Sequence, residues 1–340
     1  MAEGWIDEMK LKVVHAIADI ADRSSGVVRM TTALDAALKK AGVDSRICTS
    51  IRELKAVVDA NTILHVHNSW LSIVMFTAVL KRRTGCRLVV SPHGSMSVWA
   101  LGKSKWKKRI AWLLGMRRVW RLADAFVAAS EKEREEIATR LKAMGIRRSI
   151  EVIRFGCELC SLAVRHNPEN RDLHILYLGR VEPVKGLDRL LAQVRDVPNI
   201  CLRIAGPSIG GYGERLAARI PGCPWIEFVG EVHGEEKEAA FSWADVLVLP
   251  SYSENFGSVV AEALSRGVPV IASRGTPWQE VEAVGCGWWT DDFRAAAEAA
   301  KRADLVEMGR RGAAWVRQTF NWDKCAEQLK NFYIAVGDGN

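Results

Sequence analysis

Short runs of β-branched and aliphatic residues alternate with helical stretches along the whole chain, and this alternation constrains the fold most strongly. In the first half we predict strands at 11–17, 45–49, 62–66, 87–91, 125–129 and 151–153. The helical stretches between them run over 26–41, 69–82, 104–122 and 131–144. Strands that alternate with helices of this length predict a parallel sheet with helices on both faces.

The same alternation begins again after a polar stretch at 165–171, which we interpret as a linker. Strands of the second half are predicted at 173–178, 200–205, 225–229, 246–249 and 268–272. We therefore predict an α/β fold of two doubly wound, Rossmann-like domains that face each other across a cleft, where such folds bind ligands. The predicted domains are 1–167 and 168–320, with a final helix at about 321–336 that packs back on the first domain.

Basic residues are concentrated in the first half of the chain. Residues 1–167 carry a net charge of +13 and residues 168–340 carry −5, which together give the total of +8. This asymmetry predicts that the first half faces an anionic partner. No stretch is long and apolar enough to span a membrane, and the N-terminus lacks the pattern of a signal peptide, so we expect a cytoplasmic protein. Cys157 and Cys160 have no second Cys-x-x-Cys pair with which to form a zinc site, and all eight cysteines are expected to be reduced.

The strongest local pattern covers 249–271, where a buried strand is followed by a loop and by a helix that begins near Gly257. The first N–H groups of such a helix have no intrahelical partner and form a site for an anion. Glu254 precedes the helix and Glu262 lies inside it, so one carboxylate can reach a sugar while the other reaches a ribose. The alternative is that Glu254 is an ordinary helix-start acid and Glu262 a solvated surface residue.

A second pattern covers 178–186, at the end of the first predicted strand of the second half. Arg180 and Lys185 flank a turn that contains Pro183 and precedes a helix. Because arginine offers a planar fork and lysine a point charge, both cations can bind one diphosphate. The alternative is that both are solvated surface charges.

Together these two patterns resemble the family 4 glycosyltransferases, which are retaining enzymes of the GT-B fold. Glu254 and Glu262 match the Glu-x7-Glu motif of that family, and Arg180 and Lys185 match its Gly-Arg…Lys-Gly turn. The resemblance covers nearly all of 172–322. It implies that Arg180 and Lys185 hold the donor diphosphate. It also implies that Glu254 positions the transferred sugar and that Glu262 binds the ribose. Three further donor-binding residues follow from the same match: Asn255, Phe256 and Gly257.

The first half resembles the same family more loosely. The loop at 91–101 is similar to a Pro-His-Gly loop with a downstream Trp-Ala-Leu, which implies that His93 lies beside the reacting sugar. Gly26 stands where many members carry a Gly-Gly loop, which implies contact with phosphate or acceptor, although only one glycine remains here. Members also tend to carry Pro-Asn-Gly near the domain boundary, where this chain has Arg154, Phe155 and Gly156.

The charge of the leaving group suggests how such a site would work. As the glycosidic bond breaks, the nucleoside diphosphate gains negative charge, which Arg180, Lys185 and the helix start at Gly257 can stabilise without a metal. The chain has no Asp-x-Asp motif suited to a divalent ion, so we expect no metal and no cofactor, the nucleotide sugar being a substrate. The front-side route usually proposed for the family retains the anomeric configuration and lets the departing phosphate accept the proton of the acceptor.

The segment 103–121 combines positive charge with aromatic residues and contains no acid. Its cations are Lys103, Lys105, Lys107, Lys108, Arg109, Arg117, Arg118 and Arg121. A basic amphipathic helix that carries Trp106, Trp112 and Trp120 is typical of a surface that binds anionic lipid. We therefore expect the eight cations and three tryptophans to bind the inner face of the plasma membrane peripherally. The alternative is a solvated helix that covers the core of the first domain.

These patterns predict a hexosyl- or related glycosyltransferase that moves a sugar from a nucleotide-diphosphate-sugar to a glycan or lipid-linked acceptor in cell-surface polysaccharide or lipopolysaccharide synthesis. The alternatives are a sugar-nucleotide epimerase or phosphorylase of the same fold, or a non-enzymatic basic binding protein. The glycines at 206–213 lack the Gly-x-Gly-x-x-Gly spacing of a dinucleotide site. No nucleic-acid motif accompanies the basic segment, so no nucleic-acid partner is expected.

Overall fold

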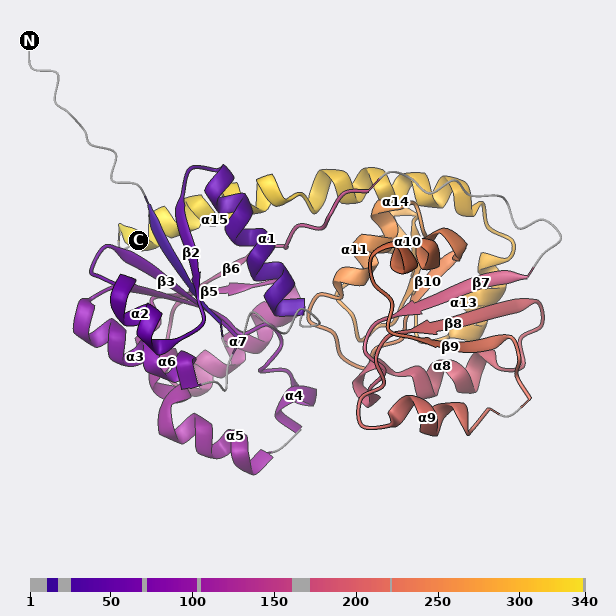
Figure 1. Ribbon diagram of the computed structural model, residues 1–340, viewed down its shortest axis with the longest axis horizontal. Helices are drawn as coiled ribbons and strands as arrows, with labels where there is room; N and C mark the ends of the chain where they lie inside the picture. Colours follow the sequence, from indigo (N-terminus) through magenta and orange to yellow (C-terminus); the bar gives the residue numbers. More distant parts are fainter. Residues whose placement is uncertain are drawn as a thin grey trace, which may run out of the picture. The chain divides into compact units, whose positions relative to one another are not determined.

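The computed structural model of the 340-residue chain describes residues 11–17, 26–68, 72–102, 105–160, 172–220 and 222–338 (Figure 1). It divides into two compact units, each with its own parallel sheet. Unit 1 consists of Met1–Gly156 and Trp322–Asn340, and unit 2 consists of Cys157–Asn321. The polar stretch at 165–171, interpreted above as a linker, lies outside the described residues. The prediction of an α/β fold with two doubly wound sheets is confirmed.

Unit 1 is built on a six-stranded parallel sheet with the order β2-β1-β3-β4-β5-β6. The strands are β1 (Lys12–Ala16), β2 (Asp44–Cys48), β3 (Thr62–His67), β4 (Arg87–Ser91), β5 (Ala125–Ala128) and β6 (Ser149–Val152). The inner strands are buried along almost their whole length, because helices cover both faces of a parallel sheet. The strand order changes direction between β1 and β3, which makes that position the switch point of the sheet.

Two segments far apart in the sequence supply the helices of unit 1. They are α1 (Gly26–Lys40), α2 (Ile51–Val57), α3 (Ser72–Thr84), α4 (Val98–Gly102), α5 (Lys105–Ala111), the π-helix η1 (Trp112–Met116), α6 (Arg117–Leu122), α7 (Glu131–Ala143) and α15 (Trp322–Gly337). The last helix, α15, lies beside α1, where Lys40 and Asp323 form an ion pair at 2.7 Å (Figure 1). The single helix expected at 104–122 is instead two α-helices joined by the π turn.

Unit 2 is built on a second six-stranded parallel sheet, with the order β9-β8-β7-β10-β11-β12. The strands are β7 (Leu173–Leu178), β8 (Ile200–Ala205), β9 (Ile226–Gly230), β10 (Val246–Leu249), β11 (Val270–Ala272) and β12 (Gly287–Trp289). Numbered from β7, this is the 3-2-1-4-5-6 order of doubly wound nucleotide-binding folds. Its switch point lies between β7 and β10, which are neighbours in the sheet.

The helices of unit 2 follow the strands in turn. They are the 3-10 turn η2 (Pro183–Lys185), α8 (Leu187–Val194), α9 (Tyr212–Ala217), α10 (Gly234–Trp243), α11 (Ser258–Ser265), α12 (Glu280–Val284), α13 (Phe293–Ala300) and α14 (Leu305–Thr319). The apolar face of α8 is buried, as its spacing of i, i+3, i+4 and i+7 predicts. Among the described residues, no helix combines the length and apolarity needed to cross a membrane.

Candidate functional site

Both motifs of the second half lie at the switch point of unit 2. The 178–186 pattern follows the carboxyl end of β7, and the 249–257 pattern follows the carboxyl end of β10. In open α/β sheets, ligands bind outside the carboxyl ends of the strands at such a position. The sheet therefore brings two segments about 70 residues apart in the chain to the edge where a ligand is expected.

The two loops are held together by their backbones. The amide of Tyr252 donates to the carbonyl of Val184 at 2.8 Å. Gly186 has a φ of 67°, and a Cβ at this position would lie 2.0 Å from the carbonyl oxygen of Pro250. A side chain at residue 186 would therefore force the loops apart, so glycine is required there.

Lys185 and Glu254 form an ion pair across these loops, with Nζ and Oε2 2.5 Å apart. Their side chains are only 16% and 15% exposed. Burial raises the pKa of Glu254, but the charge and hydrogen bond of Lys185, together with smaller hydrogen-bond contributions, outweigh it and lower this pKa below its ordinary value. Glu254 is therefore ionised at neutral pH, and its carboxylate can accept hydrogen bonds from the hydroxyl groups of a ligand.

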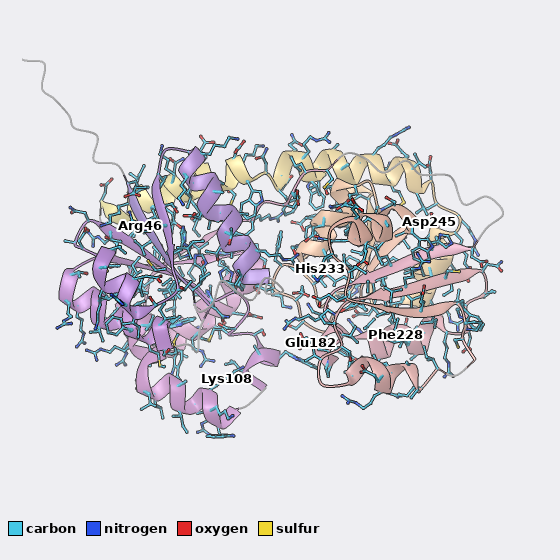
Figure 2. All side chains as sticks on the ribbon, in the orientation of Figure 1. Arg46, Lys108, Glu182, Phe228, His233 and Asp245 are labelled. Carbon is cyan, nitrogen blue, oxygen red and sulfur yellow. The ribbon has the colours of Figure 1, made fainter. Side chains whose placement is uncertain are left out.

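Arg180 lies on the same loop as Lys185 but has a different partner. Its guanidinium Nη2 is 3.0 Å from Oε1 of Glu182, which Figure 2 labels. The Arg180 side chain is 55% exposed, whereas that of Glu182 is buried. The backbone carbonyl of Arg180 accepts a hydrogen bond from the hydroxyl of Tyr177 at 2.7 Å. One loop thus carries both predicted phosphate-binding cations. Lys185 is paired with Glu254, and the side chain of Arg180 is open to solvent.

The start of α11 is fixed by a glycine and two aromatic rings. Gly257 has a φ of 74°, and a Cβ there would lie 2.8 Å from Leu249. The ring of Phe256 packs against Trp278, with centroids 5.4 Å apart, and the Trp278 indole N–H donates to the Phe256 carbonyl. The side chain of Phe256 therefore anchors the loop to the core of unit 2. The backbone N–H of Asn255 donates to the carboxylate of Glu254.

Glu262 has a cation partner that the sequence patterns did not indicate. Lys237, on α10, places Nζ 2.5 Å from Oε2 of Glu262. Ser258 donates to the other carboxylate oxygen at 3.3 Å. Lys237 lies within an acidic stretch and forms no motif with Glu262, so no local signal identifies it. The structure places Glu254 in the loop before α11 and Glu262 inside that helix, each paired with its own lysine.

A second residue that the sequence patterns missed is Arg189 on α8. Its guanidinium donates to the carbonyls of Pro250 and Ser251, both at 2.8 Å, and also contacts Asp291 at 3.1 Å. These bonds hold the start of the loop that carries Glu254. Arg189 is therefore a structural support of the candidate site, although nothing in its sequence neighbourhood distinguishes it from a surface arginine.

In unit 1, His93 lies in the loop after β4 with a φ of 50°, in the left-handed region that few non-glycine residues adopt. The next residue, Gly94, donates its N–H to the carboxylate of the buried Glu133 at 2.7 Å. The other oxygen of that carboxylate accepts from the N–H of Ala129 at 2.8 Å. Burial lowers the pKa of His93 to about 3, so its ring is neutral at neutral pH. Glu133, which holds this conformation, was missed by the sequence patterns.

The other residues of unit 1 that the resemblance singles out are Gly26 and the segment 154–156. Gly26 is the first residue of α1, and a Cβ there would meet no atom within 4 Å, so the fold itself does not require glycine. The serines before it lie outside the described residues. At the segment 154–156, Phe155 packs against the ring of His93 at 5.5 Å. Gly156 is required by packing, because a Cβ there would lie 2.5 Å from Trp322.

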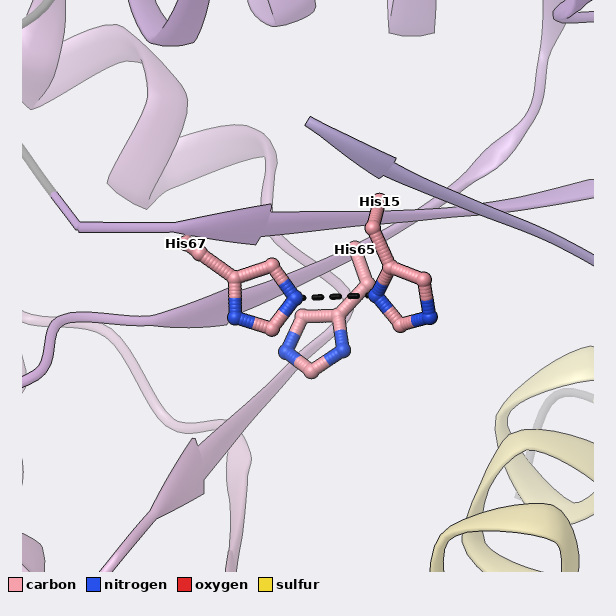
Figure 3. A group of neighbouring side chains, drawn as sticks. All are labelled: His15, His65 and His67. Atoms are coloured by element: carbon pink, nitrogen blue, oxygen red, sulfur yellow. Dashed lines mark hydrogen bonds between the residues drawn. The ribbon is translucent and has the colours of Figure 1, made fainter. Parts of the chain in front are cut away.

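Three histidines of unit 1 form a cluster that the sequence patterns did not identify (Figure 3). His15 lies on β1 and His65 and His67 lie on β3, and all three are fully buried. Among the described residues, this is the group whose spacing could hold a metal ion. The sequence signal is the placement of His65 and His67 two residues apart in one strand, which puts both on the same face. Cys157 and Cys160 are free thiols.

The basic segment differs from the amphipathic helix expected for it. Trp120 is fully buried against Phe126, with ring centroids 4.9 Å apart, and Trp112 packs on Trp120 at 5.8 Å. The expectation that all three tryptophans face a membrane is therefore wrong for these two, because they lie on the side that packs on the core of unit 1. Lys103 lies outside the described residues, and Lys108, labelled in Figure 2, bonds to the carbonyl of Ala100.

The exposed side of this segment carries other large apolar side chains. Trp106 is 65% exposed, and Leu113 and Leu114 are 73% and 78% exposed. A Cβ on Gly115 would lie 2.7 Å from the sulfur of Met75, so η1 packs tightly on α3 through this glycine. Leu113 and Leu114 precede that contact within the π turn. A π turn adds one residue to the helical repeat, a feature that often marks a functional segment.

Comparison with known proteins agrees with the fold and with the family that the chain resembles. Residues 50–156 match the family described as glycosyl transferase 4-like domain, and residues 163–322 match glycosyl transferases group 1. A D-inositol 3-phosphate glycosyltransferase of Streptomyces griseus is 34% identical over 184 residues, which cover 47% of this chain and 39% of that protein. The protein of the same name from Nocardioides sp. is 26% identical over 340 residues, which cover 87% of this chain and 73% of that protein.

A solved structure shows the same fold at low sequence identity. Anabaena HepE, in complex with UDP and glucose, superposes with a TM-score of 0.73 at 15% identity. The match covers 96% of this chain and all of that one. The relatives are named glycosyltransferases, rather than epimerases, phosphorylases or binding proteins. The two family models follow each other along the chain and together cover most of it. With the named relatives and the shared fold, they show that the chain belongs to the family 4 type of glycosyltransferases, which are transferases of the GT-B fold.

Proposed function

We propose that this protein is a retaining, metal-independent glycosyltransferase that moves a sugar from a nucleotide-diphosphate-sugar to a glycan or lipid-linked acceptor. The observation that carries the proposal is the Lys185–Glu254 ion pair at the switch point of unit 2. It offers an ionised acceptor for sugar hydroxyls and a cation for phosphate oxygens within 2.5 Å of each other. Such a pair fits the junction between the sugar and the diphosphate of the donor.

Stabilisation of charge is the chemical role proposed for these residues. When the bond between the anomeric carbon and the diphosphate oxygen breaks, its electron pair stays with the diphosphate. Lys185, the exposed guanidinium of Arg180 and the first N–H groups of α11 offset this charge without a metal. The acceptor oxygen bonds to the anomeric carbon on the same face, and its proton passes to the departing phosphate oxygen. The configuration of the donor is thereby retained.

The remaining predicted residues complete the proposed donor site. Glu254 would accept hydrogen bonds from hydroxyls of the transferred sugar, and Glu262 would accept them from the ribose. Gly26, with open space around it, leaves room for a phosphate or acceptor group beside the first turn of α1. His93 would lie beside the sugar as a neutral ring, because burial keeps its pKa low. Uridine is the first base to test, since HepE was solved with UDP.

Donor cleavage tests the proposal directly. Purified protein is incubated with UDP-, GDP- and ADP-sugars, with and without acceptor, and nucleoside diphosphate release is measured. Release should be unchanged by EDTA, since cations of the protein neutralise the diphosphate. Proton NMR of the first product should show the anomeric configuration of the donor. Loss of activity in EDTA with recovery on adding manganese or magnesium would contradict the metal-free mechanism, and an inverted product would contradict retention.

The exposed side of the α5–α6 segment supports a peripheral membrane location. We define the α5–α6 patch by its exposed residues: Trp106, Lys107, Arg109, Ile110, Leu113, Leu114, Arg117, Arg118 and Arg121. Its apolar side chains can enter the lipid interface while its cations contact anionic headgroups. We propose that this patch docks on the inner face of the plasma membrane, where lipid-linked precursors of polysaccharide or lipopolysaccharide would be accessible to the enzyme.

A further inference from the structure

The buried histidines of unit 1 form a continuous hydrogen-bonded chain that ends at His93. His15 and His65 are register partners on β1 and β3, and His67 lies on the same face two residues beyond His65 (Figure 3). Nδ1 of His15 is 2.9 Å from Nε2 of His67. Nδ1 of His67 is 2.9 Å from Nε2 of His93, and these two rings are stacked at 5.2 Å. We call His15, His67 and His93 the histidine relay.

His65 belongs to the cluster but not to the relay. Its Nδ1 lies 2.6 Å from the hydroxyl of Tyr333 on α15, and its Nε2 lies 2.8 Å from the hydroxyl of Ser91 on β4. Both ring nitrogens are therefore already hydrogen-bonded to other groups. This makes His65 a natural control, because it is as deeply buried as the relay residues beside it.

The relay has a fixed number of protons. Burial lowers the pKa of His15 to about 4 and that of His93 to about 3, and it lowers the pKa of His67 well below its ordinary value. Each relay ring is therefore neutral at neutral pH and carries one proton. Each of the two N···N bonds needs one donor and one acceptor, so two of the three protons lie in these bonds. The third is on one of the two end atoms, Nε2 of His15 or Nδ1 of His93.

The two ends of the relay are not equivalent. Nε2 of His15 is buried and has no hydrogen-bond partner among the described residues, so a proton there would be an N–H without an acceptor. For buried backbone groups, an N–H without an acceptor is rarer than an under-satisfied acceptor, and we apply the same preference to this ring nitrogen. His93 lies in the loop after β4 and is less deeply buried than His15, and its Nδ1 is not among the buried atoms that lack a partner, so water or a ligand can accept a hydrogen bond from it. The third proton therefore belongs on Nδ1 of His93.

We propose that His67 and His15 are positioning residues that hold His93 in one neutral tautomer, with Nδ1 protonated and offered to the ligand as a hydrogen-bond donor. The inference rests on the proposed function, in which His93 lies beside the transferred sugar. Its Nδ1–H would then bind a sugar oxygen. A free imidazole exchanges between two tautomers, whereas the relay removes that exchange before the ligand binds. The backbone of His93 is held independently by Glu133 through Gly94, so ring and loop are both fixed.

A metal site is the competing explanation for such a cluster, and the contacts disfavour it. Two imidazole ligands on a tetrahedral zinc, with bonds of about 2.0 Å, have nitrogens about 3.3 Å apart. The relay nitrogens of His15 and His67 are 2.9 Å apart, which is the length of a hydrogen bond. His65 would also have to give up a bond to Tyr333 or Ser91. The relay keeps all of these contacts.

The tautomer of His93 can be read without any substrate. Long-range proton–nitrogen NMR spectra of protein labelled with ¹⁵N in histidine identify the protonated nitrogen of each ring, and His93→Gln assigns the signals of His93. In the wild type, His93 should be protonated on Nδ1, the less common form of free histidine in water. His67→Phe should convert it to a mixture, while His65→Phe should leave it unchanged. A wild-type His93 that is protonated on Nε2, or that is a mixture, would overturn the proposal whether or not the variants fold.

Kinetics and metal analysis complete the test. With the relay broken, His67→Phe should lower kcat/KM for transfer about tenfold, while His65→Phe stays near the wild-type value. Equal losses in the two variants would indicate a structural role only, and would overturn the relay as a positioning device. One zinc retained after dialysis by wild type but not by His67→Phe would also overturn it. If the wild type cleaves no donor, the proposed function fails while the NMR result still decides the tautomer.

Discussion

Lys185 and Glu254 neutralise each other in a mostly buried place, so changing either one leaves a charge without its partner. Lys185→Ala removes a cation from the proposed diphosphate site, and Glu254→Ala removes the acceptor for the sugar. Each variant should lose at least ~100-fold in turnover, as is typical for a lost transition-state contact, and both should still fold. The measurement is steady-state transfer together with thermal unfolding of the same preparations.

A matched control exists in unit 1. Lys81 and Asp124 form an ion pair at 2.6 Å with similar burial, 16% and 25% exposed, but lie in none of the proposed sites. Lys81→Ala should destabilise the fold to a comparable extent and keep near-normal turnover. If Lys185→Ala, folded and supplied with the true donor, also kept near-normal turnover, the assignment of the donor site would be wrong.

The buried histidines make unit 1 sensitive to acid. Their pKa values are lowered from 6.5 in the folded state, so between that value and the folded pKa the unfolded chain binds protons that the folded chain does not. The free energy of unfolding is therefore not reduced by these groups above pH 6.5. Below that pH it falls by up to about 1.4 kcal/mol per pH unit for each group. Calorimetry should show the melting temperature of unit 1 falling from pH 6.5 to 5. His65→Phe should make the melting temperature less dependent on pH, because one of the titrating imidazoles is removed. A wild-type melting temperature that does not change over this interval would contradict the prediction.

Long strands and local motifs were predictable because their signals lie within short stretches of sequence. Parallel strands buried on both faces leave continuous apolar runs, which is why the sheets were found. The last strand, β12, was missed because it has three residues and begins with Gly287, which packs closely on Val270. The π turn was missed because one added residue barely changes the helical period. The prediction that Trp112 and Trp120 face a membrane was wrong in the same segment.

The candidate site was only partly predictable, for a related reason. Glu254 and Lys185 lie in recognisable loops, each within a few residues of a strand end. Arg189, by contrast, contacts a carbonyl 61 residues away, and His67 contacts a ring 26 residues away. Contacts of this kind depend on which strands are neighbours in the sheet. No spacing within one element encodes them, so they emerge only once the strand order is known.

The α5–α6 patch gives a prediction about a whole helical segment. Leu113→Ser combined with Leu114→Ser removes its most exposed apolar side chains and should weaken flotation with vesicles that contain phosphatidylglycerol. Exchange of Lys107 and Arg109 for serine should weaken it further. Binding of the wild type should fall between ~50 and 300 mM salt, because screening reduces the attraction between cations and headgroups.

Ile334, on α15, supplies the control for this experiment, since it is an exposed aliphatic residue at 44% exposure outside the patch. Ile334→Ser should float like the wild type. If the patch variants also float like the wild type, the segment is ordinary protein surface, and a water-soluble acceptor becomes the better proposal.

The chain passes between its two units twice, and the two crossing points are adjacent. In unit 1, Gly156 packs closely on Trp322, and in unit 2 the N–H of Cys157 donates to the carbonyl of Phe320 at 2.9 Å. Residues 157–321 therefore begin and end at neighbouring points of their own fold. Expressed alone, this interval should fold and bind nucleoside diphosphate, as titration calorimetry can measure. A chain that stops at residue 321 should instead lose the fold of unit 1, because it lacks the whole of α15, which packs beside α1 and buries Leu329 and Tyr333 in this unit. Stable folding of that shortened chain would contradict the prediction.

In genetic terms, unit 2 is an insertion within a host domain, and its two ends lie close enough to be handled as a single cassette. A recombination event that exchanges the interval 157–321 for the matching interval of a relative leaves both segments of the host uncut. Donor preference could thus be inherited separately from whatever unit 1 binds. A chimaera made at these two junctions should use the donor of the relative that supplies unit 2 and the acceptor of the protein that supplies unit 1. A single junction near residue 156 would also exchange α15 and so place a foreign helix beside α1.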